Sequence, residues 1–580
     1  MHKIFHCLLT FLVFGSPVSA QATRQQPNVL LIITDDQGYG DFGFTGNPHV
    51  QTPVLDQLAA ESVHFTHFFV SPVCAPTRSS LMTGRYSLRT GITDTYNGGA
   101  IMASGEVTIA ELLKQAGYVT GAFGKWHLGD NYPSRPGDQG FDESLIHLSG
   151  GMGQVGDVTT WFRGDSSYFD PVLWHNGRPE QYQGYCSDIF AGQASAFIKQ
   201  HQDRPFFCYL AFNAPHTPLQ VPDAYYEKYK NVEPSAGFSS DLKMSEKDKE
   251  DARKVYAMVH NIDDNLGRIF QQLKDLKIDR QTLVIFLTDN GPQQRRYVGG
   301  MRGLKGNVYS GGVRVPLLIR YPDGFPGRRS IAVNAAHIDL APTIADICKA
   351  NLPADRTIDG RSLVPLLQGQ SVAWSDRPLF FHWTRRLPER YQNMALLQGS
   401  HKLVGNADFD ASPDAFELFD LDQDPGEQVN LSTAQPAIAT ALKRRLDSIY
   451  LDLIQSPNLL TPPGIIIGDP AENPVLLNRN DASGERGIWA QEEVYGYWKA
   501  AIKEGCYNIS FRFIKPLEAG GRLVLQTGTL VHQSENRQPG VETLEMKNVC
   551  LPELQGDVVP FYAVGNRQIF PFWVRFEKKY

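Results

Sequence analysis

The chain has 580 residues and carries 55 Lys or Arg against 62 Asp or Glu, so its formal net charge is −7. That length is too great for one compact core, and two or three domains are expected. A hydrophobic content of 42% excludes a largely disordered chain, and 20% charged residues exclude a long coiled coil. The mild negative charge argues against a nucleic-acid-binding protein, which needs a concentrated basic face.

The first 20 residues predict an export signal that is not part of the fold. Lys3 precedes an apolar run over residues 4–15, and residues 18–20 form a small-residue cleavage site. The run is shorter than the roughly 20 residues that a bilayer crossing needs, and no other stretch is long enough. We therefore expect a signal peptide at residues 1–20, no stable membrane span, and a periplasmic or extracellular mature protein.

Four continuous apolar runs predict strands buried on both faces, as in a parallel sheet. They lie at Asn28–Thr34, 205–212, Thr282–Thr288 and 315–321. Helical patterns lie between them at residues 53–62, 108–116, 185–201 and 251–276. This alternation predicts an α/β domain, which we assign to residues 21–370.

The pattern changes after about residue 370. Residues 403–431 predict a strand and a turn and residues 434–453 a helix, so we expect a small α+β subdomain at residues 371–455. Residues 456–464 are typical of a linker. Short β-like patterns then predict an accessory β-sandwich-like domain at residues 465–580. Its expected strands include residues 506–514, 522–526 and 570–576, and Cys506 and Cys550 could pair within it.

Polar side chains follow three of the four buried runs. Asp35 and Asp36 follow the first, Asp289 and Asn290 follow the third, and His216 comes shortly after the second. Ligands of such sheets collect at the carboxyl ends of the strands. Carboxylate and amide oxygens suit Ca²⁺ or Mg²⁺ better than zinc, so the two acidic pairs predict a metal site. The alternative is two ordinary Asp-rich turns.

Residues 71–85 (SPVCAPTRSSLMTGR) combine a cysteine and an arginine with a helix start. Pro76 can occupy the first turn of that helix, which brings Cys74 to its N-terminus, where backbone N–H groups favour anions. Arg78, one turn further, could add a bidentate anion contact. The alternatives are a free loop cysteine and a thiol nucleophile, which would need a positioned base.

The stretch from Cys74 to Arg78, followed by LMTGR, resembles the signature of the type I, formylglycine-dependent sulfatases. These arylsulfatase-like enzymes belong to the alkaline-phosphatase-like superfamily. Five further blocks occur in the family's order: TDDQGYGD from residue 34, GYVTGAFGKWHLG from 117, APHTP from 214, TDNG from 288 and GLKG from 303. The resemblance covers about residues 27–450, and six blocks in order make it far more specific than one short motif.

The resemblance implies an α/β fold with a mostly parallel, mixed sheet sandwiched by helices. It also implies that a formylglycine-generating enzyme oxidises Cys74 to formylglycine, whose hydrated aldehyde, a gem-diol, is the nucleophile. The metal would be Ca²⁺, with Mg²⁺ as the alternative, and Cys74 would lie beside it with Asp35, Asp36, Asp289 and Asn290.

The reaction expected from this resemblance is the hydrolysis of sulfate monoesters. Arg78, Lys125 and Lys305 would supply positive charge where negative charge builds up in the transition state. His127 and His216 are candidates for proton transfer, since imidazole titrates near neutral pH. By resemblance, His216 and Lys305 face the leaving oxygen, and His127 takes a proton from the second gem-diol hydroxyl.

Two assignments stay open at this point. Arg85 is expected to support the formylglycine loop without touching sulfate. The family often has one further polar residue after the Gly-Phe-Asp element, and here either His147 or Ser149 could serve.

The substrate is expected to be an aryl sulfate or a sulfated carbohydrate. Aromatic residues in loop-like stretches could stack on a sugar ring or could serve packing. They are Trp161, Tyr168, Trp174, His175, His382 and Trp383. Two other functions fit the same residues: a phosphomonoester or phosphonate ester hydrolase on this fold, and an inactive glycan-binding relative. The intact set of charged and histidine residues speaks against the inactive relative.

Overall fold

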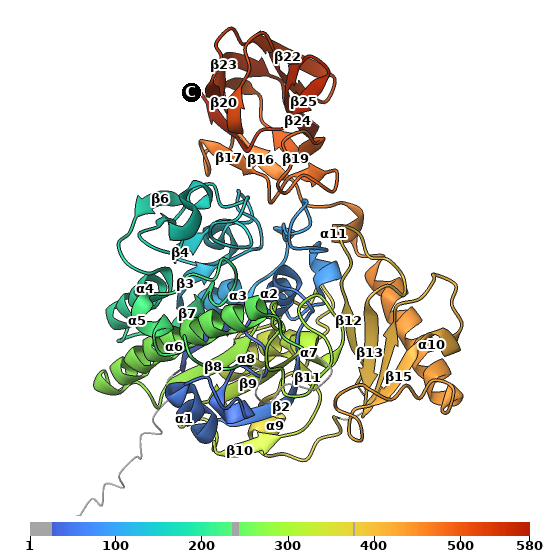
Figure 1. Cartoon of the computed structure of the whole chain (residues 1–580). Coiled ribbons are helices and arrows are strands. Elements are labelled where there is room, and N and C mark those ends of the chain that lie inside the picture. The colour runs from blue at the N-terminus through green and yellow to red at the C-terminus, as the bar shows by residue number, and fades with distance from the viewer. Residues whose placement is uncertain (1–25, 235–242, 375–376, 580) are drawn as a thin grey trace, which may run out of the picture.

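The computed structural model describes residues 26–234, 243–374 and 377–579 (Figure 1). The expected signal peptide at residues 1–20 lies outside these described residues. Within the described ranges, none of the helices combines the length and the apolar character needed to cross a bilayer.

A mixed sheet of 11 strands forms the centre of the α/β part of the molecule, in the order β10-β2-β9-β8-β1-β7-β3-β4-β5-β6, with β11 beside β2. The strands are β1 Asn28–Thr34, β2 Val63–Phe69, β3 Val119–Lys125, β4 Glu143–His147, β5 Val172–His175, β6 Arg178–Gln181, β7 Phe206–Ala211, β8 Thr282–Thr288, β9 Arg314–Arg320, β10 Arg329–Ile331 and β11 Ala335–Ala336. Strands β8, β1, β7, β3 and β4 run parallel to their neighbours within this group.

Helices cover both faces of this sheet. They are α1 Pro53–Glu61, α2 Cys74–Thr83, α3 Ile109–Gln115, α4 Cys186–Gln200, α5 Asp223–Tyr226, α6 Glu246–Asp275, α7 Ser310–Val313, α8 Leu340–Cys348 and α9 Val364–Leu367. The residues of β1 alternate between the two faces. Leu31 packs in a core with α2, α3 and α8, whereas Leu30 and Ile32 pack in a core with α1, α4 and α6. The continuous apolar run is therefore explained by burial on both sides, and the predicted fold class is confirmed.

Two details differ from the sequence prediction. The run at residues 315–321 forms β9, which pairs antiparallel with β8, so this buried strand is not part of the parallel set. Burial on both faces makes such strands alike in sequence whichever way they run. Helix α6 begins at Glu246, five residues before the predicted start, because Ser245 and Asp248 form a capping box there.

The region after residue 376 begins with a second sheet of four antiparallel strands. They are β12 Leu379–His382, β13 Met394–Gln398, β14 His401–Gly405 and β15 Glu417–Asp420. Helix α10, Pro436–Leu453, packs on it through Leu442, Leu446 and Leu453.

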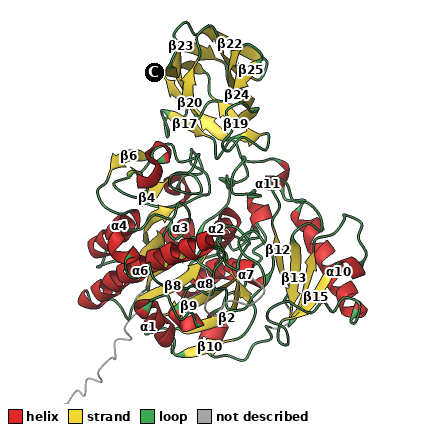
Figure 2. Cartoon of the chain, in the orientation of Figure 1, coloured by secondary structure: helices red, strands yellow, loops and turns green. Residues whose placement is uncertain are grey.

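Figure 2 shows strands joined by loops in the C-terminal region, and no helix occurs among its described residues 465–579. The strands form two sheets. One has the order β16-β19-β24-β21-β22 and the other β17-β26-β20-β23. The strands are β16 Ile465–Ile467, β17 Val475–Asn478, β18 Ser483–Gly484, β19 Gly496–Ile502, β20 Gly505–Leu517, β21 Arg522–Thr527, β22 Leu530–Glu535, β23 Val541–Leu551, β24 Leu554–Val564, β25 Arg567–Ile569 and β26 Trp573–Lys578. Buried side chains of both sheets share one core, as in a β-sandwich. Below, this region is called the β-tail.

Two features of the β-tail bear on the sequence predictions. Cys506 and Cys550 form a disulfide between β20 and β23. The last strand begins at Trp573, not at residue 570, because Pro571 has no N–H and the carbonyls of Phe570 and Pro571 accept hydrogen bonds from Arg479.

The expected linker at residues 456–464 is held against the α/β part. It contains a short helix, α11 Pro457–Leu460, and the Ser456 hydroxyl and the Asn458 amide both donate to the Arg89 carbonyl at 3.1 and 2.8 Å. The segment therefore fixes the position of the β-tail and does not act as a flexible tether.

Candidate active site

The predicted site residues meet at the carboxyl ends of four adjacent strands. Strands β8, β1, β7 and β3 lie side by side, and the loops that follow them carry Asp289, Asp35 and His216, while Lys125 ends β3. Cys74 is the first residue of α2, whose residues are all buried. The polar positions recognised in the sequence are therefore brought together by the order of the strands.

Four of these residues offer oxygen atoms that suit a divalent cation. Asp35 Oδ1, Asp36 Oδ2 and Asn290 Oδ1 are buried and have no hydrogen-bond partner among the described residues. Ligand atoms of Asp35, Cys74 and Asp289 lie within 4.8 Å of one another. Leaving such oxygens buried and unpaired is costly, and a hard cation is the partner that carboxylate and amide oxygens favour. The donor set thus fits Ca²⁺ or Mg²⁺.

Two lysines pair with the carboxylates of this set. Lys125 Nζ lies 2.6 Å from Asp35 Oδ2, and both side chains are fully buried. Lys305 Nζ lies 2.6 Å from Asp36 Oδ1, and its side chain remains 15% exposed. Each lysine contacts the second oxygen of its carboxylate, so the unpartnered oxygens stay available for a cation.

Arg78 is fully buried, and all three of its nitrogens are engaged. Its Nε and Nη2 donate to Asp289 Oδ2 at 3.1 and 2.7 Å, and its Nη1 donates to the Lys125 carbonyl and the Tyr209 hydroxyl. A guanidinium with these bonds holds Asp289 and the end of β3 in place. We therefore assign Arg78 a positioning role, beside the charge-supplying role that the sequence suggested.

His127 is oriented by the backbone around it. Its Nε2 lies 2.7 Å from the Thr95 carbonyl, which can only accept, so this nitrogen carries the proton. Its Nδ1 is buried without a partner among the described residues, and burial together with Lys125 lowers the pKa of His127 well below its ordinary value. The neutral ring thus has a free acceptor nitrogen. A Cβ on Gly150 would lie 2.7 Å from the ring, so this glycine makes room for it.

His216 lies on the open side of the site. Its Nε2 is 3.6 Å from Asp36 Oδ2, and its Nδ1 is 2.7 Å from the Thr217 carbonyl. Burial lowers the pKa of His216 to about 3, although Asp36 opposes the shift.

The buried charges also shift the pKa values of the acidic groups. Burial and neighbouring Asp35 raise the pKa of Asp289 to about 6, although Arg78 opposes this. Burial raises the pKa of the Cys74 thiol above its ordinary value, although Lys125 and Lys305 oppose this. Burial is the main cause of both shifts, because it disfavours the charged form of each group.

Comparison with known families agrees with this geometry. The family model described as "Sulfatase" matches residues 27–350, and the model described as "N-sulphoglucosamine sulphohydrolase, C-terminal" matches residues 304–451. The chain belongs to the sulfatase family. It is a sulfuric ester hydrolase, and the resemblance seen in the sequence motifs is confirmed.

Individual relatives of this sulfatase cover most of its length. Human arylsulfatase A is 33% identical over an alignment of 478 residues, and the match covers 73% of this chain and 87% of the relative. N-acetylgalactosamine-6-sulfatase of Sus scrofa is 30% identical and covers 80% of this chain and 92% of its own. A solved structure described as "Ps i-CgsB in complex with k-i-k-neocarrahexaose" has a TM-score of 0.63 at 27% identity, over 75% of this chain and 94% of its own.

The structure adds an ion pair that the sequence analysis missed. Arg296 is fully buried, and its Nε and Nη2 donate to the carboxylate of Asp41 at 2.7 to 2.9 Å. Its Nη2 also donates to the Asp36 carbonyl at 2.6 Å, and Asp41 accepts from the Gly38 N–H. This pair holds the loop in which Asp36 has a φ of 62°. Asp41 is in the recognised motif, but no local pattern connects it to Arg296.

The structure also bears on the assignments left open in the sequence. Arg85 pairs with Glu106 at 2.5 Å and so supports the region around α2. His147 lies opposite Lys125 in the pairing of β3 with β4, and its Nδ1 lies 2.9 Å from the Leu148 carbonyl. Burial lowers the pKa of His147 to about 3. The Ser149 N–H donates to Asp130, and the Ser149 hydroxyl oxygen is buried without a hydrogen-bond partner among the described residues. The next residue, Gly150, lies beside the His127 ring.

A cavity of about 440 Å³ opens above this site in the sulfatase, and His216 and Lys305 are among its lining residues. Of the aromatic and histidine residues singled out in the sequence, Trp383 lines it. Trp174, His175 and His382 lie in strands instead of loops, and Tyr168 is buried and donates to the His216 carbonyl at 2.7 Å.

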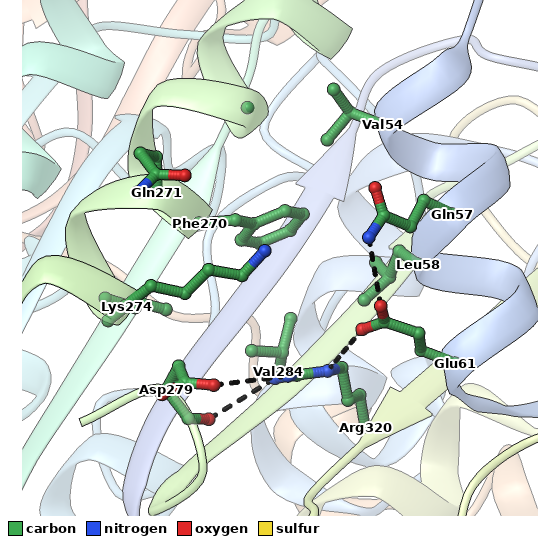
Figure 3. Close-up of a pocket in the computed structure, with 12 residues that line it drawn as sticks. Val54, Gln57, Leu58, Glu61, Phe270, Gln271, Lys274, Asp279, Val284 and Arg320 are labelled. Carbon is green, nitrogen blue, oxygen red and sulfur yellow. Dashed lines mark hydrogen bonds and ion pairs between the residues drawn. The ribbon is translucent and has the colours of Figure 1, made fainter. Parts of the chain in front are cut away.

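A second cavity lies at the opposite, amino end of β8, between α1 and α6 (Figure 3). It measures about 170 Å³. Three of its charged residues are paired with one another: Arg320 contacts Glu61 at 3.0 Å and Asp279 at 3.5 Å. This cavity is not part of the predicted active site.

Proposed function

We propose that this sulfatase hydrolyses sulfate monoesters of carbohydrates, using a formylglycine formed from Cys74 and a bound Ca²⁺. The observation that carries the proposal is the convergence of ligand atoms of Asp35, Cys74 and Asp289 within 4.8 Å of one another. Beside them lie the unpartnered oxygens of Asp36 and Asn290. This arrangement supports a nucleophile and a cation at one place, as attack on a sulfate ester requires.

The two implied groups would supply defined chemistry. A cation held by Asp35, Asp36, Asp289 and Asn290 would draw charge from the sulfate, and the hydrated aldehyde at position 74 would supply the attacking hydroxyl. The remaining work falls to side chains of the chain itself.

Positive charge is held beside the sulfate position by Lys125 and Lys305, which the carboxylates of Asp35 and Asp36 fix at 2.6 Å. Fixed charges of this kind stabilise negative charge that builds up in the transition state without reorganising. Lys305 and His216 line the cavity, so they face the side from which an alcohol would leave, and the Lys305 ammonium can protonate its oxygen. His127 can accept a proton at Nδ1, because the Thr95 carbonyl holds the proton at Nε2.

The carbohydrate part of the proposal draws on the relatives. One is an N-acetylgalactosamine-6-sulfatase, and one solved structure contains a neocarrahexaose, whereas another relative is an arylsulfatase. We also propose that the protein is exported to the periplasm or the cell exterior through the signal peptide at residues 1–20. A formylglycine-generating enzyme of the host would modify Cys74.

The proposal is tested first by the mass of the Cys74 peptide from natively produced protein. A formylglycine mass supports it, and an unmodified cysteine in a host able to oxidise it contradicts the nucleophile. Cys74→Ala should then abolish turnover of sulfate esters while the melting temperature stays close to that of the wild type. Unchanged activity in this variant would refute the mechanism.

Side-by-side rates decide between the two hydrolase functions. The wild type is assayed on matched sulfate, phosphate and phosphonate esters and on a panel of sulfated sugars. A higher kcat/KM on sulfate esters is expected, with sulfated sugars preferred over aryl sulfates. A higher kcat/KM on the phosphorus esters would support the alternative function.

A further inference from the structure

The cavity above the active site is built from three distant parts of the chain. Lys305 and Tyr96 come from the α/β part, Trp383 and Arg385 follow the strand β12, and Trp489 comes from the β-tail. Both family models end before the β-tail, at residue 451 at the latest. The wall formed by Trp489 is therefore a feature of this chain that the family match does not describe.

The aromatic residues form a continuous path away from the catalytic lysine. A Cβ on Gly306, next to Lys305, would lie 3.0 Å from the ring of Trp383. The guanidinium of Arg385 lies 4.7 Å from the Trp383 ring and 4.9 Å from the Tyr96 ring. Tyr96 in turn meets Trp489 edge-to-face, with ring centroids 5.2 Å apart. The path thus leads from the place of bond cleavage to the β-tail.

Trp489 is held in place by the backbone on both sides of it. The buried guanidinium of Arg479 donates to the carbonyls of Ile488 at 3.4 Å and Gln491 at 2.7 Å. Ile488 is fully buried in the core of the β-tail, whereas the Trp489 side chain is only partly buried. An anchored backbone with a partly exposed indole is suited to present a ring to a ligand.

The loop that carries Tyr96 connects the β-tail to the catalytic histidine. The Asn97 side chain accepts from the Gly484 N–H at 2.9 Å, and the Gly98 N–H donates to the Asn480 carbonyl at 3.4 Å. One residue before Tyr96, the Thr95 carbonyl holds His127. Docking of the β-tail therefore fixes the outer wall of the cavity relative to the reacting groups.

The chemistry of the cavity indicates an anionic sugar. None of the described residues that line it carries a carboxylate, whereas Lys305 and Arg385 are cationic, and Gln154 and Gln293 offer amides. The Arg385 side chain is 55% exposed, and its counter-ion Asp94 lies 3.3 Å away on the buried side. Aromatic faces pack on the apolar faces of sugar rings, amides bond to hydroxyls, and a guanidinium binds sulfate or carboxylate. A volume of about 440 Å³ lies within the usual range for small-ligand sites.

We propose that the β-tail completes a second sugar subsite of this enzyme. Trp489 and Tyr96 pack against the sugar that adjoins the one bearing the scissile sulfate, and Arg385 binds a second sulfate or a carboxylate on that neighbouring sugar. The substrate class is therefore an oligosaccharide with at least two acidic groups. This inference rests on the proposed carbohydrate sulfatase function.

The first test compares two substrates in the same variants. The probes are the sulfated disaccharide that the wild type hydrolyses fastest and para-nitrophenyl sulfate, and the readout is the ratio of their kcat/KM values. In Trp489→Ala this ratio should fall about tenfold, mainly through the KM of the disaccharide. Trp489→Phe, which keeps an aromatic face, should restore most of it.

The matched control is Tyr495→Ala, which removes another ring of the β-tail that is 48% exposed and does not line the cavity. Its ratio should equal that of the wild type. An unchanged ratio in Trp489→Ala, at an unchanged melting temperature, would overturn the inference. So would an equal loss of kcat/KM on both probes, because that would indicate general damage to the active site.

The second test concerns the extra acidic group. The disaccharide is assayed with and without a second sulfate, and the wild type should prefer the disulfated form. In Arg385→Gln this preference should fall at least tenfold, whereas Trp489→Ala should lose activity on both forms alike. An intact preference in Arg385→Gln would refute the role of the arginine.

The outcomes separate this inference from the proposed function. A wild type that hydrolyses para-nitrophenyl sulfate but no sulfated disaccharide would refute the subsite and leave the catalytic mechanism standing. A wild type that hydrolyses no sulfate ester, despite a formylglycine at position 74, would refute the proposed function itself.

Discussion

The two ends of the central sheet both carry charged residues, but they use them differently. At the amino end of the sheet, Arg320 forms ion pairs with Glu61 and Asp279 beside a small cavity (Figure 3). All three side chains are between 15% and 33% exposed. At the carboxyl end, Arg78 and Asp289 are fully buried. One side-chain oxygen each of Asp35, Asp36 and Asn290 there has no hydrogen-bond partner among the described residues.

Among the described residues, the only buried carboxylate oxygens without a hydrogen-bond partner belong to Asp35 and Asp36. Unsatisfied carboxylate oxygens therefore mark the site better than cavities or charged residues do. Partly exposed ion pairs contribute little to stability and are common on protein surfaces. Buried carboxylates that lack partners cost free energy, so they persist where a ligand offsets that cost. The following predictions test this contrast from the largest expected effect to the smallest.

The sharpest test removes one carboxylate from each end of the sheet. Asp289→Ala should lose stoichiometric calcium and lower kcat/KM on sulfate esters by about 1,000-fold, since a catalytic cation supplies several kcal/mol. Asp279→Ala, at the amino end of the sheet, should keep both the bound calcium and the wild-type kcat/KM. Bound calcium is measured by atomic emission on purified protein. Calcium retained in Asp289→Ala would show that the metal assignment is wrong.

The second test compares one arginine from each end. Arg296→Met breaks the buried pair with Asp41 and should lower the free energy of unfolding by about 3–5 kcal/mol, because it leaves a buried charge unpaired. Arg320→Met should cost about 1 kcal/mol, because its pairs are partly exposed. Urea unfolding measures both.

A double variant of Arg296 and Asp41 distinguishes the loss of their ion pair from the loss of side-chain packing. Arg296→Met combined with Asp41→Asn removes both charges and should recover part of the lost stability. It should not recover kcat, because the Asp36 carbonyl still lacks its donor from Arg296. Full recovery of kcat would contradict the positioning role of Arg296.

The third test extends the comparison to the β-tail. The disulfide joins residues separated by 44 positions, and Cys506→Ser with Cys550→Ser should destabilise the β-tail by about 2–4 kcal/mol. Differential scanning calorimetry should show a separate, earlier transition for this region. A single transition that shifts as a whole would mean that the β-tail and the α/β part unfold as one unit.

The smallest expected effect is on the pH dependence of stability, and it arises at the contact between the β-tail and the α/β part. The Asp130 N–H donates to Asp481 at 3.3 Å, and the Asn478 amide donates to Asp130 at 2.7 Å. Burial raises the pKa of Asp481 to about 6, and burial and Asp481 raise that of Asp130 well above its ordinary value. The folded chain then binds more protons than the unfolded chain between about pH 4 and 6, so stability falls as pH rises through this window.

Replacing one of these acids should therefore flatten the pH profile. In Asp481→Asn, the loss of unfolding free energy between pH 4.5 and 7 should shrink by about 1 kcal/mol. Unfolding midpoints at the two pH values measure it, with Asp557→Asn, an exposed acid of the β-tail, as the control. An unchanged slope would mean that Asp481 is not the titrating group.

The sequence allowed much of this architecture to be predicted because its signals are local. Continuous apolar runs identified β1, β7 and β8, and the polar residues after them converge because parallel neighbours end at one edge. The direction of β9 could not be predicted, since a strand buried on both faces has the same apolar character in either direction.

The parts that were missed depend on contacts between distant segments. Arg296 meets Asp41 across 255 positions, and neither residue lies in a pattern that refers to the other. Trp489 lies in a polar stretch of the β-tail, and only the docking of that region brings it to Tyr96. Tertiary packing of this kind leaves no periodic or spacing signal in one sequence.

The burial of Cys74 determines the order in which the protein is modified and folded. Its side chain is only 2% exposed at the start of a helix whose residues are all buried. A modifying enzyme has no access to that thiol once the sheet and α2 have formed. The oxidation that we propose therefore belongs to the nascent chain, and a molecule that folds before it is modified remains permanently inert.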